Sequence, residues 1–200
     1  LVCWGGFYPG IDAVPSGTFD SLFSGVEQSC ALREGYPSCW GGSVIAPPNV
    51  AFTTLALGNQ FACGVQVSDG AIDCWGDFPP TPPSGSFASV VAGSEFVCGL
   101  ADDGSVECAS ESIFGAPLPP NERFSSLAAA NSIVCGLTSG SRTMVCFGDE
   151  STGEISGVPT GPFESVSAGL SSNGFDAVCG LRSGGSIEGF GNGASGVTSP

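Results

Sequence analysis

The chain consists of repeated copies of one pattern, and this periodicity constrains its fold more than any other feature. Each copy begins with a Phe-x-x-apolar sequence and continues to a cysteine that precedes a small residue and Leu or Val. In four copies a second cysteine follows nine to eleven residues later, often within Cys-Trp-Gly, before a Pro/Gly/Ser-rich connector. The first residues of the copies are Phe19, Phe52, Phe87, Phe124 and Phe163.

These copies divide the 200 residues into a partial unit and five full units. Repeats of this length are typical of units that bury their apolar faces only by stacking on neighbours, so we interpret residues 1–200 as a single repeat domain. Because the chain opens at Leu1 without a methionine or an apolar leader, we expect a processed product or a piece of a longer protein. The predicted units are 1–17 (partial), 18–50, 51–85, 86–122, 123–161 and 162–200.

The cysteine spacing within a unit predicts β-hairpins, because directly opposed residues of a hairpin have a constant sum of residue numbers. The midpoints fall on a two-residue loop at 34–35, a three-residue loop at 102–104, and Gly140-Ser141, where a leading glycine suits a type II′ turn. The fourth midpoint lies one residue from Asp69-Gly70, so that hairpin needs a bulge or a longer loop. Opposed Cα atoms about 4.5 Å apart allow disulfides. The predicted bridges are Cys30–Cys39, Cys63–Cys74, Cys98–Cys108 and Cys135–Cys146.

Each unit is then a small antiparallel sheet of three strands, or four if the connector joins it. A sheet of this size needs neighbours to cover its faces. We therefore predict an all-β fold, a β-propeller built of short, disulfide-stapled antiparallel blades. The alternative is a linear β-solenoid of the same units.

Composition excludes several classes of function. The chain has 4 Lys+Arg, 19 Asp+Glu and no histidine, a formal net charge of −15, so nucleic acid and anionic membrane surfaces are poor partners. No stretch is long enough for a membrane span. Without histidine, and with carboxylates scattered over the units, we expect no enzyme, no metal and no cofactor. Ten cysteines, no two of them three residues apart, indicate a disulfide-bonded, extracellular protein.

Two kinds of candidate site have a simpler structural explanation. We expect Trp4, Trp40 and Trp75 to pack between blades, the alternative being an aromatic ring that holds a glycan or peptide. Asp69-Gly70 and the Asp-Asp-Gly loop at 102–104 are expected to be hairpin turns rather than calcium loops, because the calcium template is absent.

The proline-rich connector that closes the second full unit is expected to be a stiff, extended link. The alternative is O-glycosylation, with Thr81 and Ser84 as candidate acceptors. No Asn-x-Ser/Thr sequence is present, which excludes N-glycosylation.

The sequence Phe96-Val97-Cys98-Gly99-Leu100, taken with Cys74-Trp75-Gly76, resembles the repeat of crinkly-type plant receptor kinase ectodomains. It is also similar to regulator-of-chromosome-condensation propeller repeats. The resemblance implies a β-propeller, often of seven blades, that binds other macromolecules. This chain departs from the pattern in having five full units, in lacking the loop histidine of intracellular members, and in losing tryptophan from its later units.

Two cysteines, Cys3 and Cys179, are left without a partner in their own units. Residues 1–7 match a second-cysteine strand, and Gly189 is expected to lie opposite Cys179. We predict that residues 1–7 pair with unit 162–200 and that Cys3 bridges Cys179. Within one chain this closes a ring; between chains, the reading we favour, it makes a head-to-tail filament.

The sequence therefore favours a non-catalytic extracellular structural protein, a subunit of a fibre, coat or appendage whose partner is a further copy of itself. The alternative is a secreted or receptor-ectodomain propeller that binds a protein or glycan. Neither reading involves nucleic acid or a membrane span.

Overall fold

The computed structural model describes residues 14–26, 28–41, 46–109, 121–149, 155, 157–169 and 177–191. Within these ranges the chain forms fifteen β-strands and no helix. The strands make five three-stranded antiparallel sheets, and in each sheet the strand order follows the sequence. The predicted all-β class is confirmed, and each sheet lies within one of the predicted units.

We number the sheets as blades 1 to 5. Blade 1 consists of β1 (Ser21–Ser24), β2 (Gln28–Arg33) and β3 (Tyr36–Gly41), and blade 2 of β4 (Phe52–Leu57), β5 (Phe61–Gln66) and β6 (Ile72–Gly76). Blade 3 consists of β7 (Ser89–Ala92), β8 (Val97–Leu100) and β9 (Val106–Ala109). Blade 4 consists of β10 (Phe124–Ala129), β11 (Ile133–Thr138) and β12 (Met144–Gly148), and blade 5 of β13 (Ser165–Gly169), β14 (Ala177–Leu181) and β15 (Ile187–Gly191).

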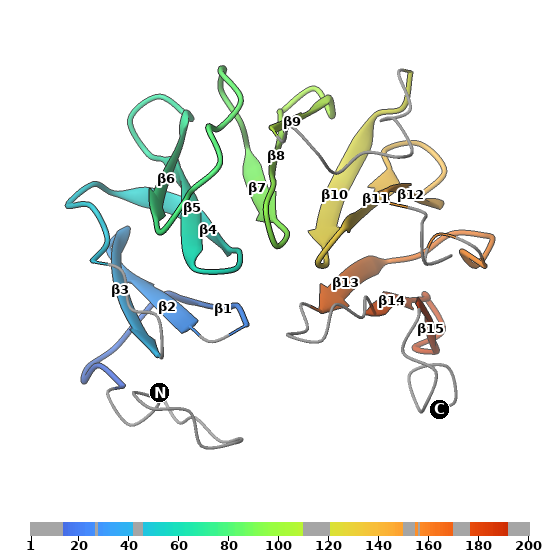
Figure 1. Ribbon diagram of the computed structural model, residues 1–200. Helices are drawn as coiled ribbons and strands as arrows, with labels where there is room; N and C mark the ends of the chain where they lie inside the picture. Colours follow the sequence, from blue (N-terminus) through green and yellow to red (C-terminus); the bar gives the residue numbers. More distant parts are fainter. Residues whose placement is uncertain are drawn as a thin grey trace.

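The blades stand side by side around a common axis (Figure 1). The first strand of each blade lies nearest the axis and the third lies outermost, and neighbouring first strands such as β4 and β7 contact one another. This radial arrangement is that of a β-propeller rather than a linear solenoid. The described blades form an arc, and blades 1 and 5 stand at its two ends.

The hydrophobic core lies between the blades. In the described residues it consists of four clusters, each shared by two neighbouring blades. In every cluster the first cysteine of one blade lies with the first phenylalanine of the next unit, which is why both residue types recur at the unit spacing. The pairs are Cys30 with Phe52, Cys63 with Phe87, Cys98 with Phe124, and Cys135 with Phe163.

A glycine after the first cysteine makes room for this phenylalanine. A Cβ atom added to Gly99 would lie 2.4 Å from the ring of Phe87, and one added to Gly136 would lie 2.4 Å from the ring of Phe124. The ring therefore packs against the glycine of its own unit and against the disulfide of the preceding one. In blade 1 this position is Ala31.

Three of the hairpin turns have the predicted length and one does not. Glu34 and Gly35 form a two-residue loop, and both have positive φ, as a type I′ turn requires. The 102–104 loop ends on Gly104, at φ 82°. The longer loop expected near Asp69-Gly70 is four residues, because Gln66 N donates to Ala71 O.

The prediction of a type II′ turn at Gly140-Ser141 is wrong. Thr138 N donates to Thr143 O, so the loop has four residues, and the residue with positive φ is Arg142 rather than Gly140. The cause is local side-chain hydrogen bonding: the Thr138 hydroxyl accepts a bond from Thr143 N and lies 2.8 Å from the Ser141 hydroxyl. These bonds favour the longer turn over the tight one.

The structure contains the four disulfides that the hairpin spacing predicts, Cys30–Cys39, Cys63–Cys74, Cys98–Cys108 and Cys135–Cys146. The structure does not support a strand of residues 1–7 directly opposite Cys179. Strand β14 is bordered by β13 on one side and β15 on the other, so neither edge is free to take a strand opposite Cys179. Cys179 is half-buried and forms no disulfide. Cys3 lies outside the described residues.

Candidate functional site

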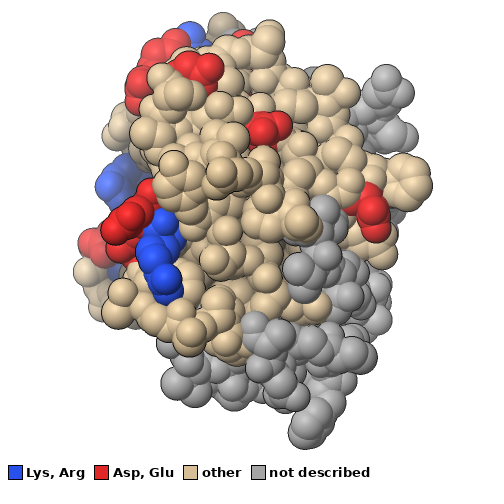
Figure 2. Space-filling model, turned by 90° about the vertical axis from the view of Figure 1, so that its left-hand side faces the viewer, with Lys and Arg blue, Asp and Glu red and all other residues tan. Residues whose placement is uncertain are grey.

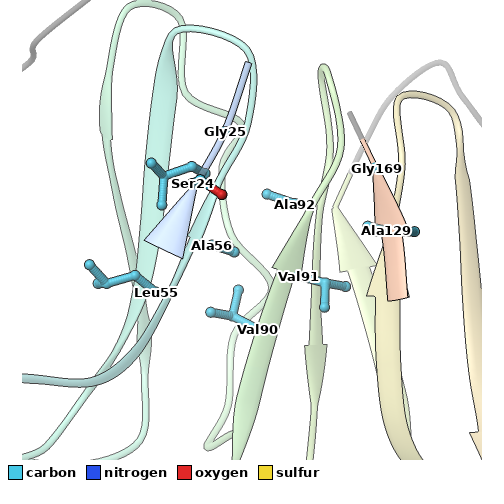
Figure 3. A pocket seen from close by; sticks show the side chains of 11 residues that line it. Ser24, Gly25, Leu55, Ala56, Val90, Val91, Ala92, Ala129 and Gly169 are labelled. Carbon is cyan, nitrogen blue, oxygen red and sulfur yellow. The ribbon is translucent and has the colours of Figure 1, made fainter. Parts of the chain in front are cut away.

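The axis of the arc contains a cavity of about 350 Å³ that the first strands of all five blades line. Along each strand the lining side chains alternate between the two faces of the blade (Figure 3): Leu55 packs between blades 1 and 2, whereas Val90 and Ala92 pack between blades 2 and 3. Among the described residues that line it, Ser24 supplies the one side-chain hydroxyl, and the others are aliphatic residues or glycines. The lining residues are Ser24, Gly25, Leu55, Ala56, Leu57, Val90, Val91, Ala92, Ala129, Ala168 and Gly169.

The strand directions give the propeller two distinct ends. We call "hairpin face" the end that carries the loops between second and third strands, together with the starts of the first strands. We call "turn face" the opposite end, which carries the turns between first and second strands and the ends of the third strands. On the hairpin face, the loops of blades 1 to 4 accept a hydrogen bond from the next unit; for example, Phe52 N donates to Gly35 O and Phe87 N to Gly70 O. These bonds join neighbouring blades at this end.

All four arginines of the chain lie on the hairpin face, and two of them occupy the same repeat position. The Arg33 guanidinium lies 4.5 Å from the ring centre of Phe19, and that of Arg182 lies 4.2 Å from the ring centre of Phe163. Each also donates to carbonyls of the segment that enters its own unit. The acceptors are Ser16 O and Thr18 O for Arg33, and Thr160 O and Pro162 O for Arg182.

The other two arginines also have partners. Arg142 donates to Phe163 O and Glu164 O of the next unit, and Arg123 lies 3.8 Å from the Asp103 carboxylate. The arginines therefore join units and loops, and none of the four guanidinium groups is without a protein partner.

Hydrogen bonds shift two carboxylate pKa values. Arg182 donates to both oxygens of Glu188 and lowers the pKa of that carboxyl, while Glu188 raises the pKa of Arg182. Hydrogen bonds from the Ser105 side chain and backbone lower the pKa of Asp103. Both carboxylates are held in the charged form by donors, the opposite of what a general acid needs.

Carboxylates outnumber the arginines on the described surface. Figure 2 shows the blue side chains gathered toward one edge of the view, with red side chains both beside them and further away. The turn face carries Asp77 and Glu95, which are exposed, and none of the arginines. Within the described ranges, no three Cys, Asp or Glu side chains are placed to hold a metal ion.

The residues that the sequence singled out have structural roles where they are described. Trp40 and Trp75 are 2% and 9% exposed. Trp75 packs between blades 1 and 2, its ring centre 5.2 Å from that of Phe52. Asp69 accepts a hydrogen bond from Ala71 N, as hairpin chemistry predicts. Trp4 lies outside the described residues.

Thr81 and Ser84 are exposed, but O-glycosylation at either site stays a prediction. The connector that carries them begins with a feature that the sequence analysis missed. Phe78 is 96% exposed and has φ +54°. The sequence contained one indication of this exposure. Four residues after the second cysteine, where this unit has Phe78, the first full unit has Ser43 and the fourth has Glu150, both polar residues.

The chain is therefore an all-β propeller whose blades are stapled by disulfides. It is similar to the entire ectodomain of the receptor kinase CR4 from Physcomitrella patens, with 27% identity over 88% of this chain and 50% of that chain, and a TM-score of 0.75. It is also similar to the CRINKLY WD40 ectodomain of the Arabidopsis thaliana receptor kinase ACR4, with 23% identity over 90% and 66% of the two chains, and a TM-score of 0.74.

A more distant likeness is to the yeast RCC1 (Prp20) complex with Kap60, at 14% identity over 82% of this chain and 54% of that chain, with a TM-score of 0.62. The neighbours are thus of the two kinds that the repeat resembles. No family model matches the sequence, and no curated protein matches it.

The chain spans half the length of the moss ectodomain and about two thirds of the Arabidopsis one. Four disulfides and two receptor-ectodomain neighbours point to an extracellular location. The part of the chain that the structure describes has no helix that could cross a membrane. The neighbours give no support to a catalytic role.

Proposed function

We propose that this chain is an extracellular interaction domain of the receptor-ectodomain kind, a propeller that binds a protein partner through its exposed loops. The observation that carries this proposal is the combination of one disulfide in each of blades 1 to 4 with a fold similar to two receptor kinase ectodomains. Disulfides replace part of the core that such small sheets lack, as extracellular domains require.

The reading as a fibre subunit has less support than this alternative. It depended on residues 1–7 completing the sheet of the last unit, and β13 and β15 already occupy both edges of β14. The neighbours are ectodomains of receptors rather than fibre proteins. A protein partner is therefore a better expectation than a further copy of this chain.

Cell-surface binding tests the proposal. The chain is produced through a secretory pathway, assembled as a fluorescent tetramer, and titrated onto intact cells of the organism that encodes it. We expect saturable binding that an excess of unlabelled chain displaces, and that is lost after the disulfides are reduced. Binding that does not saturate, or that survives reduction and unfolding, would contradict the proposal.

A further inference from the structure

Phe78 is exposed in a way that the blade itself does not explain. It is 96% exposed, the highest value among the large apolar side chains of the described residues. It follows β6 at the turn face, where the chain leaves blade 2. An apolar ring in water gives up the free energy that burial would supply, so a fully exposed phenylalanine calls for an explanation.

The backbone at Phe78 is also in an unfavourable conformation. Its φ is +54°, in the left-handed region that a bulky residue rarely adopts. The next residue, Pro79, further restricts the residue before it toward extended conformations. A hydrogen bond of 2.9 Å from Asp77 N to Gln60 O fixes the chain just before this point. The fold thus holds the ring outward rather than letting it turn onto the blade.

Phe78 opens a segment with the chemistry of a recognition motif. Four prolines follow it within Pro79–Pro83, interrupted by the exposed Thr81. Proline fixes φ near −65°, so such a segment is extended and stiff before it meets any partner. Binding then orders little chain, and the grooves that accept extended proline segments are lined by aromatic side chains.

The acidic charge around the segment indicates which charge the partner's groove should carry. Asp77 directly precedes Phe78, and the turn face carries none of the four arginines. A groove with a basic rim complements this surface, whereas an acidic rim would be repelled by it. The long-range attraction is reinforced by the net charge of −15.

We propose that Asp77–Pro83 is a protein-docking segment: Phe78 enters an apolar pocket, and the prolines lie in an adjoining aromatic-lined groove with a basic rim. This inference rests on the proposed function, because it names the site at which that partner is bound. The second unit also departs from the repeat in this segment. At the position of Phe78, the first full unit has Ser43 and the fourth has Glu150.

The test uses two purified probes with aromatic-lined, proline-binding grooves, a WW and an EVH1 domain, each chosen to have basic residues at the rim of its groove. Each is titrated into the intact ¹⁵N-labelled chain and followed by NMR. We expect at least one probe to give saturable shifts centred on 77–83, and Phe78→Glu to weaken that binding at least tenfold. The substitution copies the fourth unit, so the folded spectrum should otherwise be unchanged. Val67→Glu is the matched control, because Val67 is 58% exposed but lies on the hairpin face.

Three results would overturn the proposal: no probe binds, Phe78→Glu binds as tightly as the wild type, or Val67→Glu weakens binding equally. Cell-surface binding separates this site from the proposed function. If wild type and Phe78→Glu bind cells equally, the docking segment is wrong and the function stands. If the probes bind the segment but the cells do not bind the chain, the function is wrong and the segment stands.

Discussion

Cys179 lies directly opposite Gly189 in the pairing of β14 with β15, at the position where each of the other four blades has a disulfide. In all five blades, the cysteine position of the second strand lies opposite the same position of the third strand. Blade 5 therefore has the geometry for a bridge and lacks only its second sulfur.

Gly189→Cys should supply that sulfur. We expect a fifth disulfide with Cys179 and a gain in stability of about 2–3 kcal/mol, because the bridge restricts the unfolded chain. Thermal unfolding with and without reductant measures the gain, and Gly189→Ser is the control for the added side chain. Two reactive thiols at 179 and 189 in the folded variant would show that the register does not permit the bond.

Cys179 should be reactive in the native wild-type protein, since it is half-buried and unbridged. Alkylation without denaturant, followed by peptide mapping, should modify it and leave the eight bridged cysteines unmodified. Recovery of Cys179 linked to Cys3 instead would restore the bridge that the sequence suggested. A ladder on non-reducing electrophoresis that collapses on reduction would restore its inter-chain form.

Gly99→Ala should destabilise the protein by about 1–3 kcal/mol, a typical cost of overpacking a core. The new methyl group would lie 2.4 Å from the ring of Phe87, which is buried between blades 2 and 3. Urea denaturation measures the change. Gly140→Ala is the matched control, because nothing lies within 4 Å of its added Cβ. Equal stability of the two variants would mean that the ring moves aside without cost.

Phe52→Ala should cost about 3–5 kcal/mol, because it leaves a cavity beside the Cys30–Cys39 disulfide. Phe78→Ala removes the same ring from a position that is 96% exposed and should cost almost nothing. The pair of variants, compared by urea denaturation, separates the core phenylalanines from the docking one. A similar loss for both would place Phe78 in a core.

The pKa of Glu188 should return toward its usual range in Arg182→Gln, because the donor that lowers it is removed. A carboxyl whose pKa is lower in the folded than in the unfolded protein stabilises the fold above its unfolded pKa. That stabilisation is lost as the pH falls through the folded pKa. NMR titration of the Glu188 side chain gives the shift directly. An unchanged pKa in the variant would show that the ion pair does not form in solution.

Much of the fold was predictable because it depends on local spacing. The turns at 34–35 and 102–104 and the four disulfides follow from the distance between cysteines across one hairpin, and a hairpin needs no other part of the chain to set its register. The loop at 139–142 was not predictable from glycine placement alone, because hydroxyl groups of Thr138 and Ser141 hydrogen-bond within it. The candidate site was harder to predict: Phe78 differs from a core phenylalanine by its surroundings rather than its identity.

By itself, the sequence determined the repeat, the three-stranded unit, the disulfide pairs and the acidic, histidine-free composition. Only the tertiary structure decided that the units stack radially, since that depends on how neighbouring blades pack on one another, as Phe52 does on Cys30 of the preceding blade. Tertiary structure also decided that β13 and β15 occupy both edges of β14, so a strand that carries Cys3 would not lie directly opposite Cys179. Edges and exposed faces are properties of how the units assemble, and the spacing of residues along one chain does not contain them.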